Sequence, residues 1–100
     1  MNIKKTYGSQ EIERDFGKLT FGKALWSYRK CEEISQKKFA LSLGISSQSL
    51  CDIEKGRKIP SPKRVIRIAK LINQPAKVWI ELSLQDILRQ ENLDYVVSVA

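Results

Sequence analysis

Residues 35–60 read SQKKFALSLGISSQSLCDIEKGRKIP, a stretch with regularly placed serine and glycine residues. Ser35 and Ser46 are typical N-cap residues, because a serine hydroxyl accepts a hydrogen bond from a free backbone N–H in the first turn of a helix. Gly44 and Gly56 tolerate the left-handed backbone that commonly ends a helix. The stretch therefore predicts two short helices joined by a tight turn, with the N-terminus of the second helix exposed.

Apolar residues at helical spacing predict three further helices around this pair. The first begins at an N-cap on Thr20 and ends near Glu32. The fourth begins at Ser61-Pro62, where a proline at the first helical position costs no hydrogen bond. The fifth opens at Pro75 and ends before Asn92. Its apolar residues cover more than one face, so one side is available to a second subunit.

These elements predict an all-α, five-helix domain over residues 20–91, with the helix-turn-helix at about 35–57. An N-terminal arm, residues 1–19, precedes it, and Ser9 can cap a short helix there. Residues 92–100 hold a β-prone segment, YVVSV. Because a lone strand is unstable, we expect this one to pair with its mate across the two-fold axis of a homodimer.

The net charge of +7 is unevenly distributed along the chain. Residues 20–60 carry +4 and residues 61–80 carry +5, whereas residues 81–100 carry −3. A basic middle suits a polyanion such as nucleic acid. A solvated, lysine-rich surface would give the same distribution, so charge alone leaves both interpretations open.

The composition argues against several other classes of protein. The chain has no histidine, and its two cysteines, Cys31 and Cys51, are too few and too irregularly placed for a disulfide scaffold or a zinc site. We therefore expect no metal and no cofactor, and a small hydrolase or nuclease lacks a nucleophile–base pair to support it. Neither a secretory signal nor a membrane span is present, so we expect a cytoplasmic protein without a membrane partner.

The segment SQKKFALSLGIS at 35–46, followed by IEKGR at 53–57 and Pro60, resembles the Xre family of lambda-repressor-like helix-turn-helix domains. The resemblance spans about residues 20–82 and implies a five-helix DNA-binding fold. In such a fold the second helix of the pair lies in the major groove of double-stranded DNA. This groove is about 12 Å wide and accepts one helix.

The resemblance and the side-chain chemistry together imply a set of DNA contacts. Gln36 is expected to touch a phosphate and to brace a glutamine on the recognition helix, and Gln48 can pair with adenine N6 and N7. Asp52 can accept from cytosine N4 or act as a negative filter, while Cys51 can contact a thymine methyl or stay an inert thiol. The expected contacts are Gln36, Ser46, Ser47, Gln48, Cys51, Asp52, Lys55, Arg57 and Lys58.

Other residues are expected to act on the structure rather than on DNA. The resemblance implies a partly buried ion pair between Arg29 and Glu54, which ties the first helix to the third. Trp26 and Trp79 lie on amphipathic helices outside the motif, so we expect them to pack or to lie at a dimer interface. The expected dimer surface comprises Trp79, Leu84, Ile87, Leu88, Tyr95 and Val97.

Two functional hypotheses follow from the sequence. The first is a homodimeric repressor that occupies a pseudo-palindromic operator, with an activator role left open. The second is an antitoxin that neutralises a toxin and regulates its own operon, because FGKLTFG at 16–22 and the terminal strand resemble HigA-like antitoxin regulators. Four acidic residues near the C-terminus would suit a basic toxin: Glu81, Asp86, Glu91 and Asp94.

Overall fold

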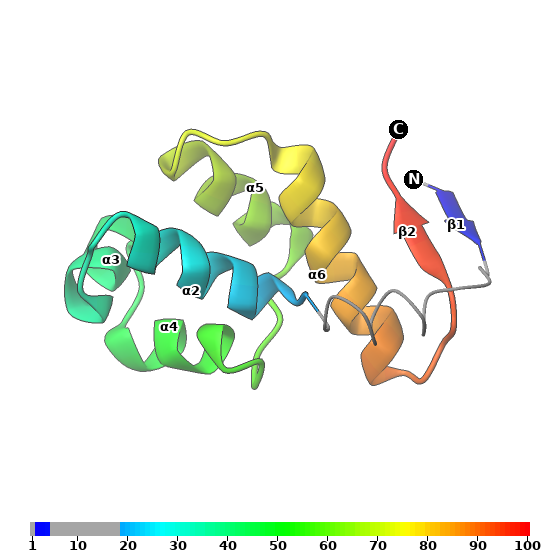
Figure 1. Ribbon diagram of the computed structural model, residues 1–100, viewed down its shortest axis with the longest axis horizontal. Coiled ribbons are helices and arrows are strands. Elements are labelled where there is room, and N and C mark those ends of the chain that lie inside the picture. The colour runs from blue at the N-terminus through cyan, green and yellow to red at the C-terminus, as the bar shows by residue number, and fades with distance from the viewer. Residues whose placement is uncertain (1, 5–18) are drawn as a thin grey trace.

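The computed structural model of the chain describes residues 2–4 and 19–100, so the expected helix capped by Ser9 lies outside the described residues. The described part holds five helices and a two-stranded sheet (Figure 1). The helices are α2 (Phe21–Cys31), α3 (Gln36–Leu43), α4 (Ser47–Glu54), α5 (Pro62–Leu71) and α6 (Ala76–Gln90). The strands are β1 (Asn2–Lys4) and β2 (Val96–Ser98). The expectation of an all-α, five-helix domain is therefore confirmed.

The predicted N-caps begin four of the helices. The hydroxyl of Thr20 accepts from Lys23 N at 3.1 Å, and the hydroxyls of three serines accept in the same way at the starts of α3, α4 and α5. These serines are Ser35, Ser46 and Ser61. The fifth helix, α6, begins after Pro75 without a side-chain cap. Local chemistry thus sets where these helices start, as the sequence indicated.

One hydrophobic core joins the five helices. Its largest fully buried side chains include Phe21 and Leu25 from α2, Phe39 from α3 and Leu50 from α4. Burial of each such side chain stabilises the fold by about 1.5–3 kcal/mol before ordering costs. No helix among the described residues is both long enough and apolar enough to cross a membrane.

Gly22 sets how closely α2 approaches α4. A Cβ atom at this position would collide with the carbonyl oxygen of Ile53 and would lie 2.8 Å from that of Glu54. Both oxygens belong to the backbone, so they cannot move aside as a flexible side chain would. The missing side chain therefore lets the last turn of α4 rest directly on α2, which fixes the position of the helix.

The C-terminal strand β2 pairs with a different strand from the one expected. β2 pairs antiparallel with β1 of the same chain, with Ile3 opposite Val97 (Figure 1). The prediction that the terminal strand pairs with its mate in a second subunit is therefore wrong for this edge of β2. The N-terminal arm, which the sequence left without a role, supplies the missing strand and removes the need for a second subunit there.

The opposite edge of β2 bonds to side chains of α6. The amide of Gln85 donates to Tyr95 O at 2.6 Å and accepts from Val97 N at 2.9 Å. Glu81 accepts from Val99 N at 3.1 Å. These bonds satisfy backbone groups that a further strand would otherwise use, and they hold β2 against α6.

Two of the six expected dimer residues are buried inside the chain. Trp79 is only 5% exposed, packs edge-on against Phe21 at 5.5 Å between ring centroids, and donates its Nε1–H to Gln74. Val97 is 6% exposed. This burial places both in the core of the chain, which for Trp79 is the packing role that the sequence left open beside an interface, because periodicity cannot tell a core face from an interface. Leu84 and Leu88 are half-buried, and only Ile87 and Tyr95 are exposed.

Candidate nucleic-acid interface

A tight turn presents α4 to the outside of the molecule. Gly44 adopts a left-handed conformation with φ of +71°, and Ile45 N donates to Ala40 O at 3.0 Å to close the end of α3. Ser46 then caps α4 immediately. This short connection leaves the N-terminal turn of α4 at the surface, where its first backbone N–H groups are accessible to a ligand.

The two faces of α4 are sharply different. Leu50 and Ile53 are buried in the core, whereas Ser47 and Gln48 are exposed. Cys51 is half-buried. The first turn of the helix therefore presents small polar groups and one amide, as the sequence analysis expected of base-reading positions.

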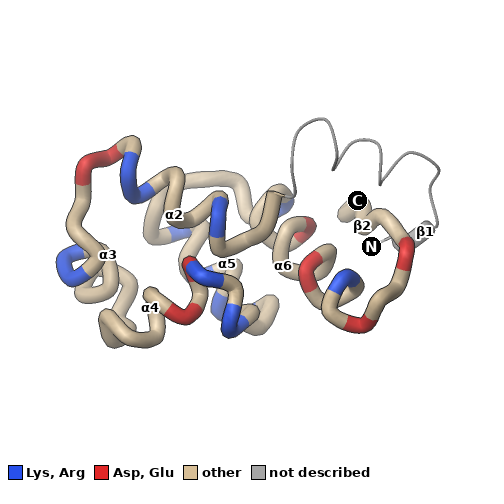
Figure 2. The backbone as a smooth tube through the Cα atoms, turned by 60° about the horizontal axis from the view of Figure 1, so that its bottom comes forward, with Lys and Arg blue, Asp and Glu red and all other residues tan. Residues whose placement is uncertain are grey.

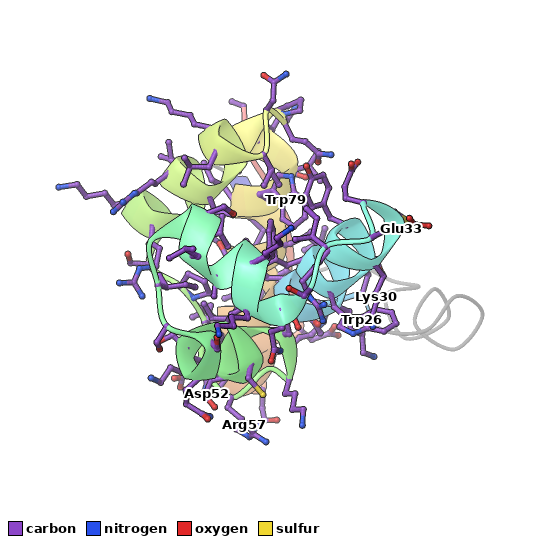
Figure 3. All side chains as sticks on the ribbon, turned by 90° about the vertical axis from the view of Figure 1, so that its left-hand side faces the viewer. Trp26, Lys30, Glu33, Asp52, Arg57 and Trp79 are labelled. Atoms are coloured by element: carbon purple, nitrogen blue, oxygen red, sulfur yellow. The ribbon has the colours of Figure 1, made fainter. Side chains whose placement is uncertain are left out.

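Asp52 is the centre of a polar cluster on this outer face. Its Oδ1 accepts from Gln48 Nε2 at 3.1 Å and from Arg57 Nη1 at 2.9 Å, while Lys58 Nζ lies 3.7 Å from Oδ2. The hydrogen bond from Arg57 holds the pKa of this carboxyl below its ordinary value, and the same contact raises the pKa of Arg57. Figure 3 shows Asp52 and Arg57 together at the edge of the molecule, far from Trp79.

This cluster changes the expected role of Asp52. The sequence left open a cytosine contact or a negative filter, but in the structure the carboxylate bonds to two other candidate DNA contacts. It therefore orients the amide of Gln48 and the guanidinium of Arg57. Asp52 Oδ1 is therefore used in hydrogen bonds within the protein rather than in a hydrogen bond to a base.

A second cluster lies beneath α4 and joins three helices. Arg29 Nε donates to Glu54 Oε2 at 2.7 Å, and Arg29 Nη2 donates to Glu54 Oε1 at 3.1 Å. The two side chains are 8% and 3% exposed, so the structure contains the ion pair that the resemblance implied. Arg29 Nη1 also donates to Ile34 O at 3.1 Å, which ties the pair to the start of α3.

Gln36 braces this ion pair rather than the recognition glutamine. Its Nε2 donates to Glu54 Oε1 at 3.1 Å. The expected brace to Gln48 is absent from the described hydrogen bonds, because Gln48 bonds to Asp52 instead. Gln36 remains half-buried at the N-terminus of α3, and its contact with a phosphate stays a prediction.

Exposed cations continue the surface past the end of α4. Lys55, Arg57 and Lys58 are all exposed, and Arg57 N donates to Asp52 O at 2.8 Å, which fixes the loop on the helix. Figure 2 shows acidic segments along α6 and the chain that follows it, whereas the basic segments lie mainly on α2 to α5. The candidate DNA surface therefore lies at the more basic end of the molecule.

The acidic residues near the C-terminus are less available to a toxin than the sequence suggested. Of the four acidic residues considered for that role, Glu81 accepts from Val99 N. Asp86 accepts from Phe21 N at 2.9 Å and pairs with Arg89 at 3.5 Å. Internal contacts therefore engage Glu81 and Asp86, and the electrostatic argument for a basic partner weakens accordingly.

Trp26, which we expected to pack or to lie at a dimer interface, does not pack in the core of the chain, and its interface role stays a prediction. Its side chain is 46% exposed on α2, and Lys30 Nζ lies 5.7 Å from the ring centroid (Figure 3). The stripe that α2 buries consists of Phe21, Leu25 and Arg29, and Trp26 follows Leu25 directly, so helical geometry turns it away from the core. That offset was readable from the sequence.

The fold and this surface together define a helix-turn-helix DNA-binding domain of the Xre-like type. The sequence model of the helix-turn-helix domain family matches residues 22–92, and the chain belongs to this family. The chain is also similar to the "ImmF control region 10 kDa protein" of Bacillus phage phi105, with 49% identity over 45 residues. That alignment covers 45% of this chain and 50% of the relative, so the chain spans about half the length of the curated relative. These matches support a role for the chain as a transcriptional regulator.

Proposed function

We propose that this protein is a sequence-specific repressor that binds its operator as a homodimer. Each subunit places the N-terminal turn of α4 in a major groove, and two successive grooves lie about 34 Å apart on one side of the duplex. The observation that carries the proposal is the exposed Gln48, held by Asp52 and flanked by Arg57. The name of the phage relative assigns it to a control region, which suits the same role.

Gln48 supplies the base contact. Its Nε2 donates to Asp52, so the amide has a defined orientation in which Oε1 is the oxygen left for a partner. In the major groove, the donors that match such an acceptor are adenine N6 and cytosine N4. A fixed amide loses less side-chain entropy on binding than a freely rotating one, which favours discrimination between bases.

Lys55, Arg57 and Lys58 supply the contacts to phosphates. All three are exposed beyond the C-terminal end of α4, so they can reach the backbone while the helix lies in the groove. Phosphate contacts add affinity for every sequence and make it fall with salt, by a slope of about 0.9 for each phosphate neutralised. Base contacts and phosphate contacts are therefore separable by experiment.

A selection from a random duplex library followed by fluorescence anisotropy tests the proposal. The full chain should enrich one sequence, and Gln48→Ala should reduce its preference over a scrambled duplex by about tenfold. Arg57→Ala should instead weaken binding to both duplexes and lower the salt slope. Lys77→Ala removes an exposed cation from α6 and is the matched control. Failure to enrich any sequence, with the chain folded, would contradict the proposal.

The homodimer requires a surface at the other end of the molecule. Ile87, Leu93, Tyr95 and Val96 are exposed hydrophobic residues on α6 and the segment that follows it, with exposures of 37%, 46%, 40% and 38%. Exposed apolar residues that gather at one end of a small domain favour association with a second copy. Such a contact would leave α4 of each subunit facing away from the partner.

Sedimentation equilibrium tests this dimer with two matched variants. Ile87 and Val78 are both exposed on α6, and nine residues of helix place them on opposite faces. Ile87→Asp should convert a dimer to a monomer, whereas Val78→Asp should not. A wild-type chain that is monomeric at every concentration, and on operator DNA, would contradict the dimer while leaving the DNA contact of α4 untouched.

A further inference from the structure

The outer side of α5 carries positive charge that the proposed DNA contacts do not use. Residues 61–80 hold five cations and no acidic residue. Four of these cations lie on α5: Lys63, Arg64, Arg67 and Lys70. All four are exposed, and within the described part of the chain none of their side chains is hydrogen-bonded or paired with a carboxylate. The described residues therefore leave this charge unneutralised.

The geometry of α5 places three of these cations in one outward row. The helix faces the core through Val65 and Ile68, which are buried. Lys63, Arg67 and Lys70 follow one another at spacings of four and three residues, so they share the opposite side of the helix. With a rise of about 1.5 Å for each residue, the row is about 10 Å long. It can therefore meet several side chains of one partner.

Apolar side chains border this row on both sides. Ile66 is 37% exposed and Leu71 is 52% exposed. Because successive residues of a helix are turned by about 100°, Ile66 lies on one side of the row and Leu71 on the other. The surface therefore combines cations with hydrophobic groups, and the name α5 face is used below for its five residues: Lys63, Ile66, Arg67, Lys70 and Leu71.

The α5 face is separate from the candidate DNA surface. Figure 1 shows α4 and α5 on opposite sides of α2, and Figure 3 shows Asp52 and Arg57 at the end of the molecule away from α5. Arg64, in the first turn of α5, lies beside Lys58 in a hollow between the two helices. Arg67 lies further along α5. A duplex bound by the first turn of α4 therefore leaves most of the α5 face accessible.

The chemistry of the α5 face suits an acidic protein segment better than nucleic acid or a membrane. Protein–DNA interfaces are more polar than protein–protein interfaces, so they gain less from covering Ile66 and Leu71. A helix that lies on a membrane buries a continuous apolar side, whereas cations run along the middle of this face. Arginine is enriched at protein–protein interfaces, and carboxylates supply the complementary charge.

We propose that the α5 face binds a protein segment that carries both acidic and apolar side chains, and that it does so while α4 holds DNA. Carboxylates of the partner pair with Arg67 and Lys70, and its apolar side chains cover Ile66 and Leu71. Such a partner is acidic, unlike the basic toxin that the sequence analysis considered. The inference goes beyond the proposed function and does not depend on it, because it uses no residue of the candidate DNA surface.

Selection from a library of displayed random peptides, with the full chain as bait, tests this proposal. The enriched peptides should contain Asp or Glu together with Leu, Ile or Phe. The double variant Arg67→Glu with Lys70→Glu should bind an enriched peptide about tenfold more weakly in fluorescence anisotropy, because like charges then face each other. Lys77→Glu reverses an exposed cation of α6 and is the matched control, which should bind as the wild type does. Selection without acidic peptides, or equal binding by the double variant, would overturn the proposal.

Competition with DNA separates the α5 face from α4. The enriched peptide should bind equally well when the chain is saturated with the selected duplex, and the double variant should keep the base preference that depends on Gln48. Displacement of the peptide by the duplex would overturn the proposal, as would phosphatidylglycerol vesicles that bind the α5 face more tightly than the peptide does. A wild type that selects no duplex would contradict the proposed function alone, since the peptide measurement still decides this inference.

Discussion

Asp52 accepts a hydrogen bond from Arg57 at 2.9 Å. Asp52, which was expected to contact bases, therefore orients Arg57, which was expected to contact the DNA backbone. The same carboxylate oxygen accepts from Gln48 at 3.1 Å. The candidate base contact and the candidate phosphate contact therefore share one anchor. This coupling makes Asp52 a positioning residue for both.

Replacing Asp52 by asparagine should raise affinity and lower specificity. Asp52→Asn removes a negative charge that faces the phosphates and releases Arg57, so binding to any duplex should strengthen and the salt slope should rise by about 1. The hydrogen bond from Gln48 becomes weaker because its acceptor is no longer charged, so Gln48 is oriented less firmly and the preference for the selected sequence should fall. Glu91→Gln removes the same charge at the far end of α6 and is the control for anisotropy titrations. Weaker binding to all duplexes would contradict this role.

DNA binding should be independent of pH between about pH 5 and 8. The chain has no histidine, and the hydrogen bond from Arg57 holds the pKa of Asp52 below its ordinary value of 3.8. Because folding lowers this pKa, the stabilisation is present above the unfolded value and is lost as the pH falls through the folded one. Anisotropy at constant ionic strength checks the plateau, and a midpoint inside that range would contradict it.

Breaking the pair of Arg29 and Glu54 should strongly destabilise the fold. Arg29→Ala leaves a carboxylate buried at 3% exposure, and the loss should be about 3–5 kcal/mol in urea unfolding. The double variant Arg29→Met with Glu54→Leu removes both charges and should recover much of that loss. A double variant as unstable as the sum of the single ones would show that the pair is not coupled.

A methyl group at Gly22 should separate α2 from α4. Gly22→Ala sets a Cβ against the backbone oxygen of Ile53, so we expect a loss of about 3 kcal/mol or more. Gly56→Ala meets no atom within 4 Å and should cost only the roughly 1–2 kcal/mol of a left-handed backbone at φ +78°. Thermal melts compare the two, and a Gly22→Ala protein as stable as the wild type would refute this close approach.

Replacing Glu33 by asparagine should stabilise the protein. Glu33 ends α2 with a φ of +55°, the same left-handed position that Asn73 and Asn92 occupy after α5 and α6. Asparagine tolerates this conformation better than glutamate, so Glu33→Asn should gain roughly 0.5 kcal/mol and raise the melting temperature by a few degrees. Glu32→Asn removes the same charge at a φ of −83° and should show no such gain.

Local signals in the sequence were sufficient to predict the helices. Ser35, Ser46 and Ser61 cap helices through their own first turns, and Gly44 ends α3, so these boundaries depend on a few neighbouring residues. The pair of Arg29 and Glu54 followed from the family resemblance. Such features are readable without knowledge of how the helices pack.

Contacts between distant segments were harder to predict. The pairing of β1 with β2 joins the two ends of the chain, and no local pattern at Ile3 indicates a strand. Trp79 lies on a helix with apolar residues on several faces, so its side could be assigned to the core only from the packing of α2. The bond of Asp52 to Arg57 depends on the path of the loop after α4, which the sequence does not specify.

An NMR titration of the ¹⁵N-labelled chain with the selected duplex tests whether α4 faces DNA. The largest amide shifts should occur at residues 46–49 and 55–58. Amides of β2 should stay unchanged at a fixed oligomeric state. Shifts confined to β2 and the end of α6, with residues 46–49 unaffected, would contradict it.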